Sequence, residues 1–282
     1  MFKRLFSYNS PASKKTRGVS RWTVGLFVVV LLVALTLRLA RALRPDPTVS
    51  VADIEPIAFE DIDESTTTPE PKPTPTPTPS PVPPPEQQPS EEPANSASEL
   101  NLAVPFVSQA PFGIWDAFHE ETCEEASFLM ALAFYDGDST LDSTEADNKF
   151  YDMVAVEESL GMGVSISVAE AEQFIEHYFN RQITIYENPT VADIKSLVAS
   201  GRPVIVPAAG RKLGNPFFTG AGPLYHMLVI RGYTEDVFIT NDPGTRHGQN
   251  YTYDADVLMS AIADWNNGDP EHGAKRVFVI EP

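Results

Sequence analysis

The fold of this chain is decided by residues 123–135, which read CEEASFLMALAFY. Their apolar side chains recur at helical spacing, so the stretch predicts a helix with one apolar face. Thr122 precedes it and Glu125 follows three residues later, which is the spacing of a capping box. We therefore expect Thr122 to be the N-cap and Cys123 to lie in the first turn. The expected apolar face consists of Ala126, Leu129, Met130, Ala133 and Phe134.

Around this helix the sequence is helical first and strand-like later. Two more amphipathic helices are predicted at residues 168–179 and 191–198. Runs rich in β-branched and aromatic residues predict strands. These runs are residues 183–186, 203–207, 225–233, 237–240 and 276–280. Because the helices come early and the strands gather late, we expect an α+β layout rather than a regular alternation of strands and helices.

Composition divides the 282 residues into three zones. Residues 1–44 carry nine Lys or Arg and no acid, residues 45–100 carry twelve acids and one Lys, and residues 101–282 carry 27 acids and ten bases. The net charge of −19 argues against nucleic-acid binding, because phosphate contact requires clustered Lys and Arg. The single cysteine excludes a disulfide framework and a Cys-rich zinc site. Neither an H-E-x-x-H pair nor a calcium-loop spacing occurs, so no metal or cofactor is expected.

The first zone contains a candidate membrane anchor. Residues 22–37 read WTVGLFVVVLLVALTL without a charge, and snorkelling of Arg38 and Arg41 extends the span to residue 43. We expect a transmembrane helix at residues 22–43; a buried core helix and a cleaved signal peptide are the alternatives. The basic tail, residues 1–21, favours a cytoplasmic N-terminus, which leaves the rest of the chain outside the cytoplasm at the cell membrane.

Residues 44–100 are expected to form a disordered linker that is acidic and rich in Pro and Thr. Twelve of the 25 residues from Pro69 to Pro93 are proline. Proline fixes φ and removes the N–H donor, so this run favours an extended spacer over a packed core. A ligand for a proline-reading domain is the alternative. The remaining residues, 101–282, form one domain-sized unit.

Cys123 stands where a nucleophile would be expected. At a helix start, unpaired N–H groups and the positive end of the helix dipole stabilise a thiolate. The alternative is a small buried hydrophobe, as most free cysteines are. A cysteine nucleophile also requires a base and a group that orients the base.

Three other side chains can complete such a site. His226 lies in the predicted strand 225–233, and the next strand ends in Asn-Asp-Pro-Gly at residues 241–244, so Asp242 can accept a hydrogen bond from the imidazole. Gln109 and the Cys123 backbone N–H could form a two-donor oxyanion hole. Taken singly, His226 fits a satisfied core histidine, Asn-Asp-Pro-Gly a turn, and Gln109 a loop residue.

Together these residues resemble the papain-like cysteine peptidase family 39, and more closely its bacterial C39-like branch. The resemblance covers roughly residues 102–280 and implies a papain-like α+β fold, with a helical part that carries the cysteine and an antiparallel sheet that carries the histidine and aspartate. It implies that Cys123 is the nucleophile and His226 the general base, and that Asp242 orients the base while Gln109 donates to the oxyanion. The residues that carry it are Gln109-Ala110-Pro111, Trp115, Cys123-Glu124-Glu125-Ala126-Ser127, His226 and Asn241-Asp242-Pro243-Gly244.

The expected function is a membrane-anchored, extracytoplasmic cysteine peptidase-like hydrolase that cleaves a peptide or protein amide through a thioacyl-enzyme. Leader-peptide processing coupled to export is not implied, because the chain has one candidate span and no G-x-x-x-x-G-K loop. Two alternatives remain open. One is an amidase or endopeptidase acting on cell-wall peptide; the other is a catalytically inactive domain that binds a cell-envelope partner.

Overall fold

The computed structural model describes residues 54–62 and 98–282. The anchor expected at residues 22–43, the basic tail before it and most of the expected linker lie outside these ranges. Within the described ranges, no helix is both long and apolar enough to cross a membrane.

Helix α2, Cys123–Tyr135, begins and ends where the sequence predicts. The expectation of a single apolar face is wrong, because every residue of α2 is buried. The helix packs against strands β3 (Val204–Ala209) and β4 (Tyr225–Tyr233) and against helix α3 (Ser143–Ser159). Thr122 holds the N-cap position, but its hydroxyl donates to the backbone oxygen of Gln109 at 3.0 Å and does not cap the helix. The predicted capping box is therefore absent, and Glu125 is buried without a role at the cap.

The other helices frame α2. Helix α4, Val168–Phe179, and helix α5, Val191–Ala199, agree with the predictions and start with capping boxes. Helix α3, Ser143–Ser159, is not apparent in the sequence because only four of its residues are buried. The short elements are η2 (Phe59–Asp61), η4 (His119–Glu121), α6 (Gly210–Leu213), α7 (Ala255–Ala261) and η5 (Pro270–His272).

The strands form one sheet in which every pairing is antiparallel. The order is β2-β7-β3-β4-β5-β6, and β1 also pairs with β4. The predicted strands are all present within two residues of their expected bounds, whereas β1 and β6 are not predicted. The bounds are β1 Leu100–Asn101, β2 Ile183–Glu187, β3 Val204–Ala209, β4 Tyr225–Tyr233, β5 Val237–Asn241, β6 Tyr251–Asp254 and β7 Arg276–Ile280.

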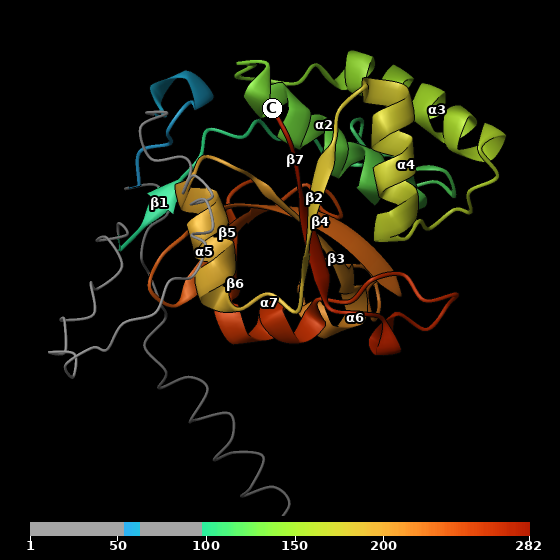
Figure 1. Cartoon of the computed structure of the whole chain (residues 1–282). Coiled ribbons are helices and arrows are strands. Elements are labelled where there is room, and N and C mark those ends of the chain that lie inside the picture. The colour runs from blue at the N-terminus through green and yellow to red at the C-terminus, as the bar shows by residue number, and fades with distance from the viewer. Residues whose placement is uncertain (1–53, 63–97) are drawn as a thin grey trace, which may run out of the picture. The chain divides into compact units, whose positions relative to one another are not determined.

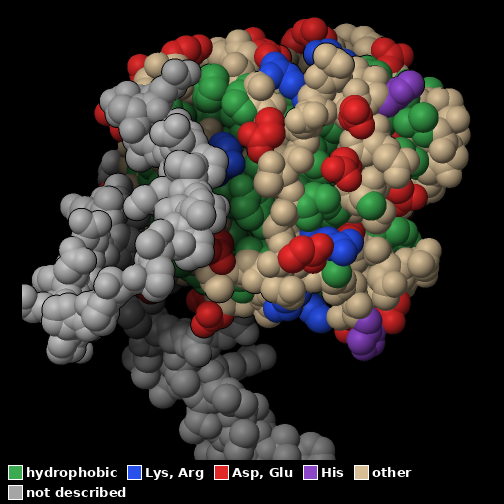
Figure 2. All heavy atoms as spheres, viewed as in Figure 1, with side chains coloured by type: hydrophobic (Ala, Val, Ile, Leu, Met, Phe, Trp, Pro, Cys, Tyr) green, Lys and Arg blue, Asp and Glu red, His purple; other side chains and the backbone are tan. Residues whose placement is uncertain are grey.

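The central strand β4 is buried along its whole length. It pairs with β3 so that His226 lies opposite Ala208, and with β5 so that Val229 lies opposite Asn241. Helices α2, α3 and α4 gather at one side of the domain, and α6 and α7 lie at the opposite side (Figure 1). The expected α+β class with an antiparallel sheet is thus confirmed. On the face seen in Figure 2, acidic side chains are scattered rather than gathered in one patch.

Residues 54–62 pack on this domain, which corrects the linker expectation for that stretch. Ile57 forms a parallel bridge with Leu102, and its backbone N–H donates to Asn101 at 2.8 Å. The Phe59 ring meets the rings of Phe134 and Tyr135 edge-on, at 5.6 and 5.1 Å between centroids. The stretch contains apolar residues that can be buried, unlike the proline run that follows it, so it adds to the core.

Arg231, buried in β4, ties the start of the domain to the sheet. Its guanidinium donates to the Asn101 side chain at 2.9 Å and to the backbone oxygens of Leu102 and Val104, the latter at 2.8 Å. Burial lowers the pKa of Arg231 to about 10, so the side chain remains charged at neutral pH. These contacts hold residues 101–104, the segment that leads to Gln109, against the sheet.

Candidate active site

Cys123 begins α2 at the wall of a pocket of about 700 Å³. The thiol side chain is largely buried, with 5% of the residue exposed. Gln109, His226 and Gly244 line the same pocket, although they come from a loop, from β4 and from the turn after β5. The fold therefore gathers the residues that the sequence analysis singled out.

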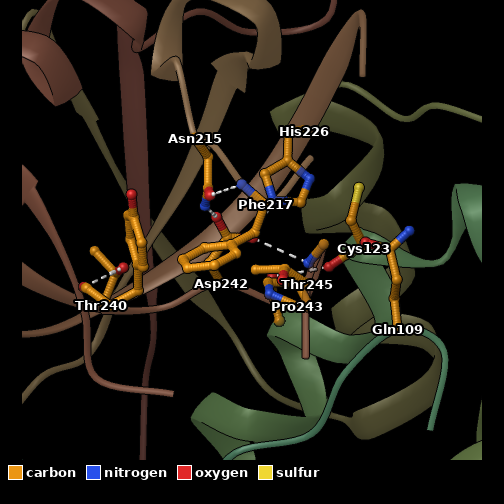
Figure 3. Close-up of polar contacts among 12 residues, drawn as sticks. Gln109, Cys123, Asn215, Phe217, His226, Thr240, Asp242, Pro243 and Thr245 are labelled. Atoms are coloured by element: carbon orange, nitrogen blue, oxygen red, sulfur yellow. Dashed lines mark hydrogen bonds and ion pairs between the residues drawn. The ribbon is translucent and has the colours of Figure 1, made fainter. Parts of the chain in front are cut away.

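His226 lies between Cys123 and Asp242. Its Nε2 is 2.7 Å from Asp242 Oδ1, and both side chains are essentially inaccessible to solvent. Because Nε2 faces the carboxylate, Nδ1 is the ring nitrogen on the Cys123 side, as the close-up shows (Figure 3). An imidazole held this way by a carboxylate keeps Nδ1 free to accept a proton from a thiol.

The second oxygen of Asp242 is held by two residues that the sequence analysis missed. Tyr253 donates its hydroxyl to Oδ2 at 2.5 Å, and Asn215 donates its amide at 3.1 Å. Burial works against the charge of Asp242, but the neighbouring His226 and these hydrogen bonds hold its pKa below the ordinary value. Tyr253 lies in the unpredicted strand β6 and Asn215 follows the short α6, so no local pattern pointed to them.

The Asn-Asp-Pro-Gly segment is more than a turn. The backbone N–H of Gly244 donates to Asp242 Oδ1 at 2.9 Å. A Cβ atom added at Gly244 would approach His226 Cε1 to 2.8 Å, closer than such atoms come in proteins, and Phe218 to 3.0 Å, which is a tight contact. The Phe218 ring meets the imidazole edge-on at 5.3 Å. The imidazole is thus clamped between a ring and a glycine that a side chain cannot replace.

Gln109 lies beside Cys123 (Figure 3), across a gap of fourteen residues in sequence. Its backbone N–H donates to Pro243 at 3.0 Å, which joins this loop to the turn that carries Asp242. Its side-chain Nε2 donates to the His119 backbone oxygen at 2.8 Å and keeps a second hydrogen. Within the described part of the chain, the buried Gln109 Oε1 has no partner.

The Cys123 thiol is directed at Glu124, the next residue along the chain. Its Sγ donates to Glu124 Oε2 at 2.8 Å, and among the described residues it forms no hydrogen bond with His226. Burial and the nearby Glu124 raise the pKa of Cys123 well above its ordinary value, whereas the Met227 backbone N–H acts in the opposite direction. Burial and Glu124 thus act against the thiolate that the helix start would favour.

Three buried carboxyl groups lie next to one another behind the thiol. Burial raises the pKa of Glu124 to about 8, and repulsion from Glu157 adds to the effect. Burial raises the pKa of Glu157, in α3, to about 7, although its hydrogen bond with Glu125 acts in the opposite direction. The pKa of Glu125 is raised in the same way. No Lys or Arg in the described ranges forms an ion pair with any of them. No group of three or more His, Cys, Asp or Glu side chains there could hold a metal ion.

These carboxyl groups predict a fold that is more stable in acid. Because their folded pKa values lie above the unfolded value near 4.5, the unfolded chain releases its protons first, and stability falls as pH rises from about 5 to about 8. For Glu157 the loss is on the order of 3 kcal/mol, or on the order of 5–10 °C in Tm. Thermal unfolding of the full chain across this pH range measures the effect.

The matched variants for that measurement are Glu157→Gln and Glu158→Gln. The first removes a buried titrating group and should flatten the decline of Tm with pH. The second changes an exposed neighbour on the same helix and should leave the decline unchanged. Equal slopes in both variants would contradict the assignment to Glu157.

The remaining histidines are not at the thiol. His119, four residues before Cys123, has its two ring nitrogens 2.8 Å from Asp116 and from Asp147, so both are engaged and the ring anchors the loop. His177, His247 and His272 are exposed.

The α+β fold thus brings a cysteine at a helix start, a strand histidine and a following aspartate together at one pocket. The chain belongs to the Peptidase_C39 like family, which matches residues 101–269. The resemblance drawn from the residues is thereby confirmed. A Bacillus anthracis protein of known crystal structure, described as a C39-like peptidase, is 15% identical, with a TM-score of 0.44 over 65% of this chain and 98% of its own. No curated protein matches the chain.

Proposed function

We propose that this chain is a cysteine peptidase that cleaves a peptide or protein amide, with Cys123 as nucleophile, His226 as general base and Asp242 as the residue that orients the base. The observation that carries the proposal is the imidazole of His226, which is bound to Asp242 through Nε2 and turns Nδ1 toward Cys123 in a shared pocket. A purely structural role for His226 would not require Nδ1 to lie on the side of the Cys123 thiol.

The proposed reaction starts with transfer of the Cys123 proton to His226 Nδ1 while sulfur attacks the substrate carbonyl carbon. The oxyanion that forms is received by the Cys123 backbone N–H and by the second hydrogen of Gln109 Nε2. His226 then returns the proton to the leaving amine, which leaves a thioester on Cys123. Water attacks the thioester, and His226 removes a proton from that water to restore the free thiol.

The pocket favours substrates that are uncharged or basic near the cleaved bond. Glu120, Glu121 and Glu124 line it together with Trp115 and Trp265, and no Lys or Arg from the described part of the chain does. Acidic side chains beside aromatic rings favour cationic groups and oppose carboxylates.

We further propose that the domain acts outside the cytoplasm at the membrane. The support is in the sequence: an uncharged run at residues 22–37 behind a basic tail, and a proline-rich spacer before the domain. Cell-wall peptide as the substrate keeps the same chemistry. An inactive envelope-binding domain is the second candidate, which the raised pKa of the Cys123 thiol favours.

The test is covalent trapping by a peptide that ends in a vinyl sulfone, followed by mapping of the adduct. Since Cys123 is the only cysteine, a single adduct identifies it without competition. We expect one equivalent of the probe to add to the full chain, and His226→Ala to slow the addition by at least about a hundredfold. Peptides of the same sequence without the vinyl sulfone should be cut into two products. Addition at the same rate in His226→Ala, with no cleavage of any peptide, would favour the inactive binding domain.

A further inference from the structure

Glu124 occupies a position between the thiol and a wall of the pocket. Its Oε2 accepts the Cys123 thiol at 2.8 Å, and its Oε1 accepts the backbone N–H of Ile166 at 3.4 Å. The residue is 2% exposed and lines the pocket, next to residues 163–165 of the loop that ends at Ile166. Glu124 thus connects the Cys123 thiol to the backbone of Ile166, at the end of the loop that lines the pocket.

The surroundings of Glu124 contain several groups that titrate. They are Glu125 from the same helix, Glu157 from α3, Tyr225 and His226 from β4, and Asp264. No described Lys or Arg lines this pocket to balance the carboxyl. An acid in the first turn of a helix is favourable on the surface, but burial without a cation is costly. The contact with the thiol therefore has to be explained by something other than charge pairing.

A thiol has one hydrogen, and it can be directed at one acceptor. In this structure it is directed at Glu124 and not at His226. A carboxyl at this distance opposes the thiolate in two ways: it accepts a hydrogen bond that only the neutral thiol can donate, and any negative charge it carries repels the sulfur. Both effects keep the proton on sulfur.

We propose that Glu124 is a latch that keeps the Cys123 thiol neutral and turned from His226 until the pocket is occupied. Release consists of rotation of the thiol from Glu124 to His226 Nδ1 and transfer of its proton to that nitrogen, with no covalent change at Glu124. Glu124 and residues 163–165 line the same pocket, and through this shared lining we expect a bound substrate to act on the latch. The latch rests on the proposed function, since it assigns a regulatory contact to the same nucleophile.

The experiment is alkylation of the full chain by iodoacetamide between pH 5 and 10, followed by mass spectrometry of Cys123. Glu124→Gln should speed alkylation at pH 7 by at least about tenfold and lower the midpoint of the pH profile by at least about one unit. Glu157→Gln is the matched control: it removes a carboxyl from the same cluster that does not touch sulfur, and should change the rate by less than about threefold. Unchanged alkylation in Glu124→Gln would overturn the latch, and slower alkylation would make Glu124 a base instead.

A second variant of Glu124 and a double variant with His226→Ala distinguish failure of the latch from failure of the proposed Cys–His pair. If Glu124→Gln does not fold, Glu124→Asp shortens the side chain, moves the carboxyl from sulfur and should also speed alkylation; a rate equal to that of the unmodified chain would overturn the latch. His226→Ala is combined with Glu124→Gln. If Glu124→Gln speeds alkylation but His226→Ala has no effect in that background, the latch stands and the proposed Cys–His pair fails. If only His226→Ala matters, the latch fails and the pair stands.

Discussion

Replacement of Cys123 by alanine should lower kcat/KM for a cleaved peptide by at least about 10⁴-fold, to the level of the uncatalysed reaction. In the proposed mechanism the Cys123 sulfur forms the thioester, and Cys123 is the only cysteine in the chain, so no other thiol can take over. Cys123→Ser should lower kcat/KM nearly as much, because the His226 imidazole removes a proton from a hydroxyl far less readily than from a thiol. Peptide cleavage followed by mass spectrometry measures the loss.

The control for this result is Ser159→Ala, which alters an exposed polar side chain at the end of α3, outside the pocket lining. We expect its kcat/KM to stay within about threefold of the unmodified chain, since no charge and no proton carrier is removed. Cleavage retained at a hundredth or more of its rate in Cys123→Ala would show that the nucleophile is not Cys123 and would contradict the proposed mechanism.

Replacement of Asp242 by asparagine should lower kcat/KM by about 10²–10⁴-fold. The imidazole of His226 depends on Asp242 for its tautomer, because Nε2 must carry the proton for Nδ1 to accept one. An amide in place of the carboxylate removes the charge that supports the imidazolium, and its N–H₂ can face Nε2 and favour the wrong tautomer. Thermal unfolding of the same variant separates this effect from loss of the fold.

Two tyrosines refine that prediction. Tyr253→Phe removes the hydroxyl that donates to Asp242 Oδ2 and should cost about tenfold, with a change in the acid limb of the pH–rate profile because the pKa of Asp242 rises. Tyr251→Phe changes the neighbouring ring, which meets the Tyr253 ring edge-on at 4.8 Å without a hydroxyl contact to Asp242, and should leave the profile unchanged. Equal profiles for the two variants would indicate that Tyr253 packs against the site without positioning Asp242.

Much of the secondary structure is legible in the sequence. Helix α2 and strand β4 have their predicted bounds. A long apolar run at helical spacing favours a helix, and a run of β-branched and aromatic residues with few breakers favours a strand. Helix α3 and strand β6 were missed for a physical reason. The first buries only four side chains and the second spans four residues, so tertiary contacts, rather than local pattern, hold them in place.

The candidate site divides in the same way. Cys123 at a helix start, His226 in a strand and Asp242 after the next strand are readable from residue type and order, because hairpin pairing of neighbouring strands brings such positions together. Glu124, Tyr253 and Asn215 are not, since their contacts depend on burial and on segments that meet only in the folded chain.

The sequence by itself determined the family, the central helix and the residues able to carry the chemistry. Only the tertiary structure decided what surrounds the Cys123 thiol. A helix start alone would favour a thiolate, but burial and a buried carboxyl at 2.8 Å raise the pKa of the thiol. The reason is that the free energy of a charge depends on everything within several ångströms of it, and those neighbours come from α3, from β4 and from a distant loop that no local pattern can assemble.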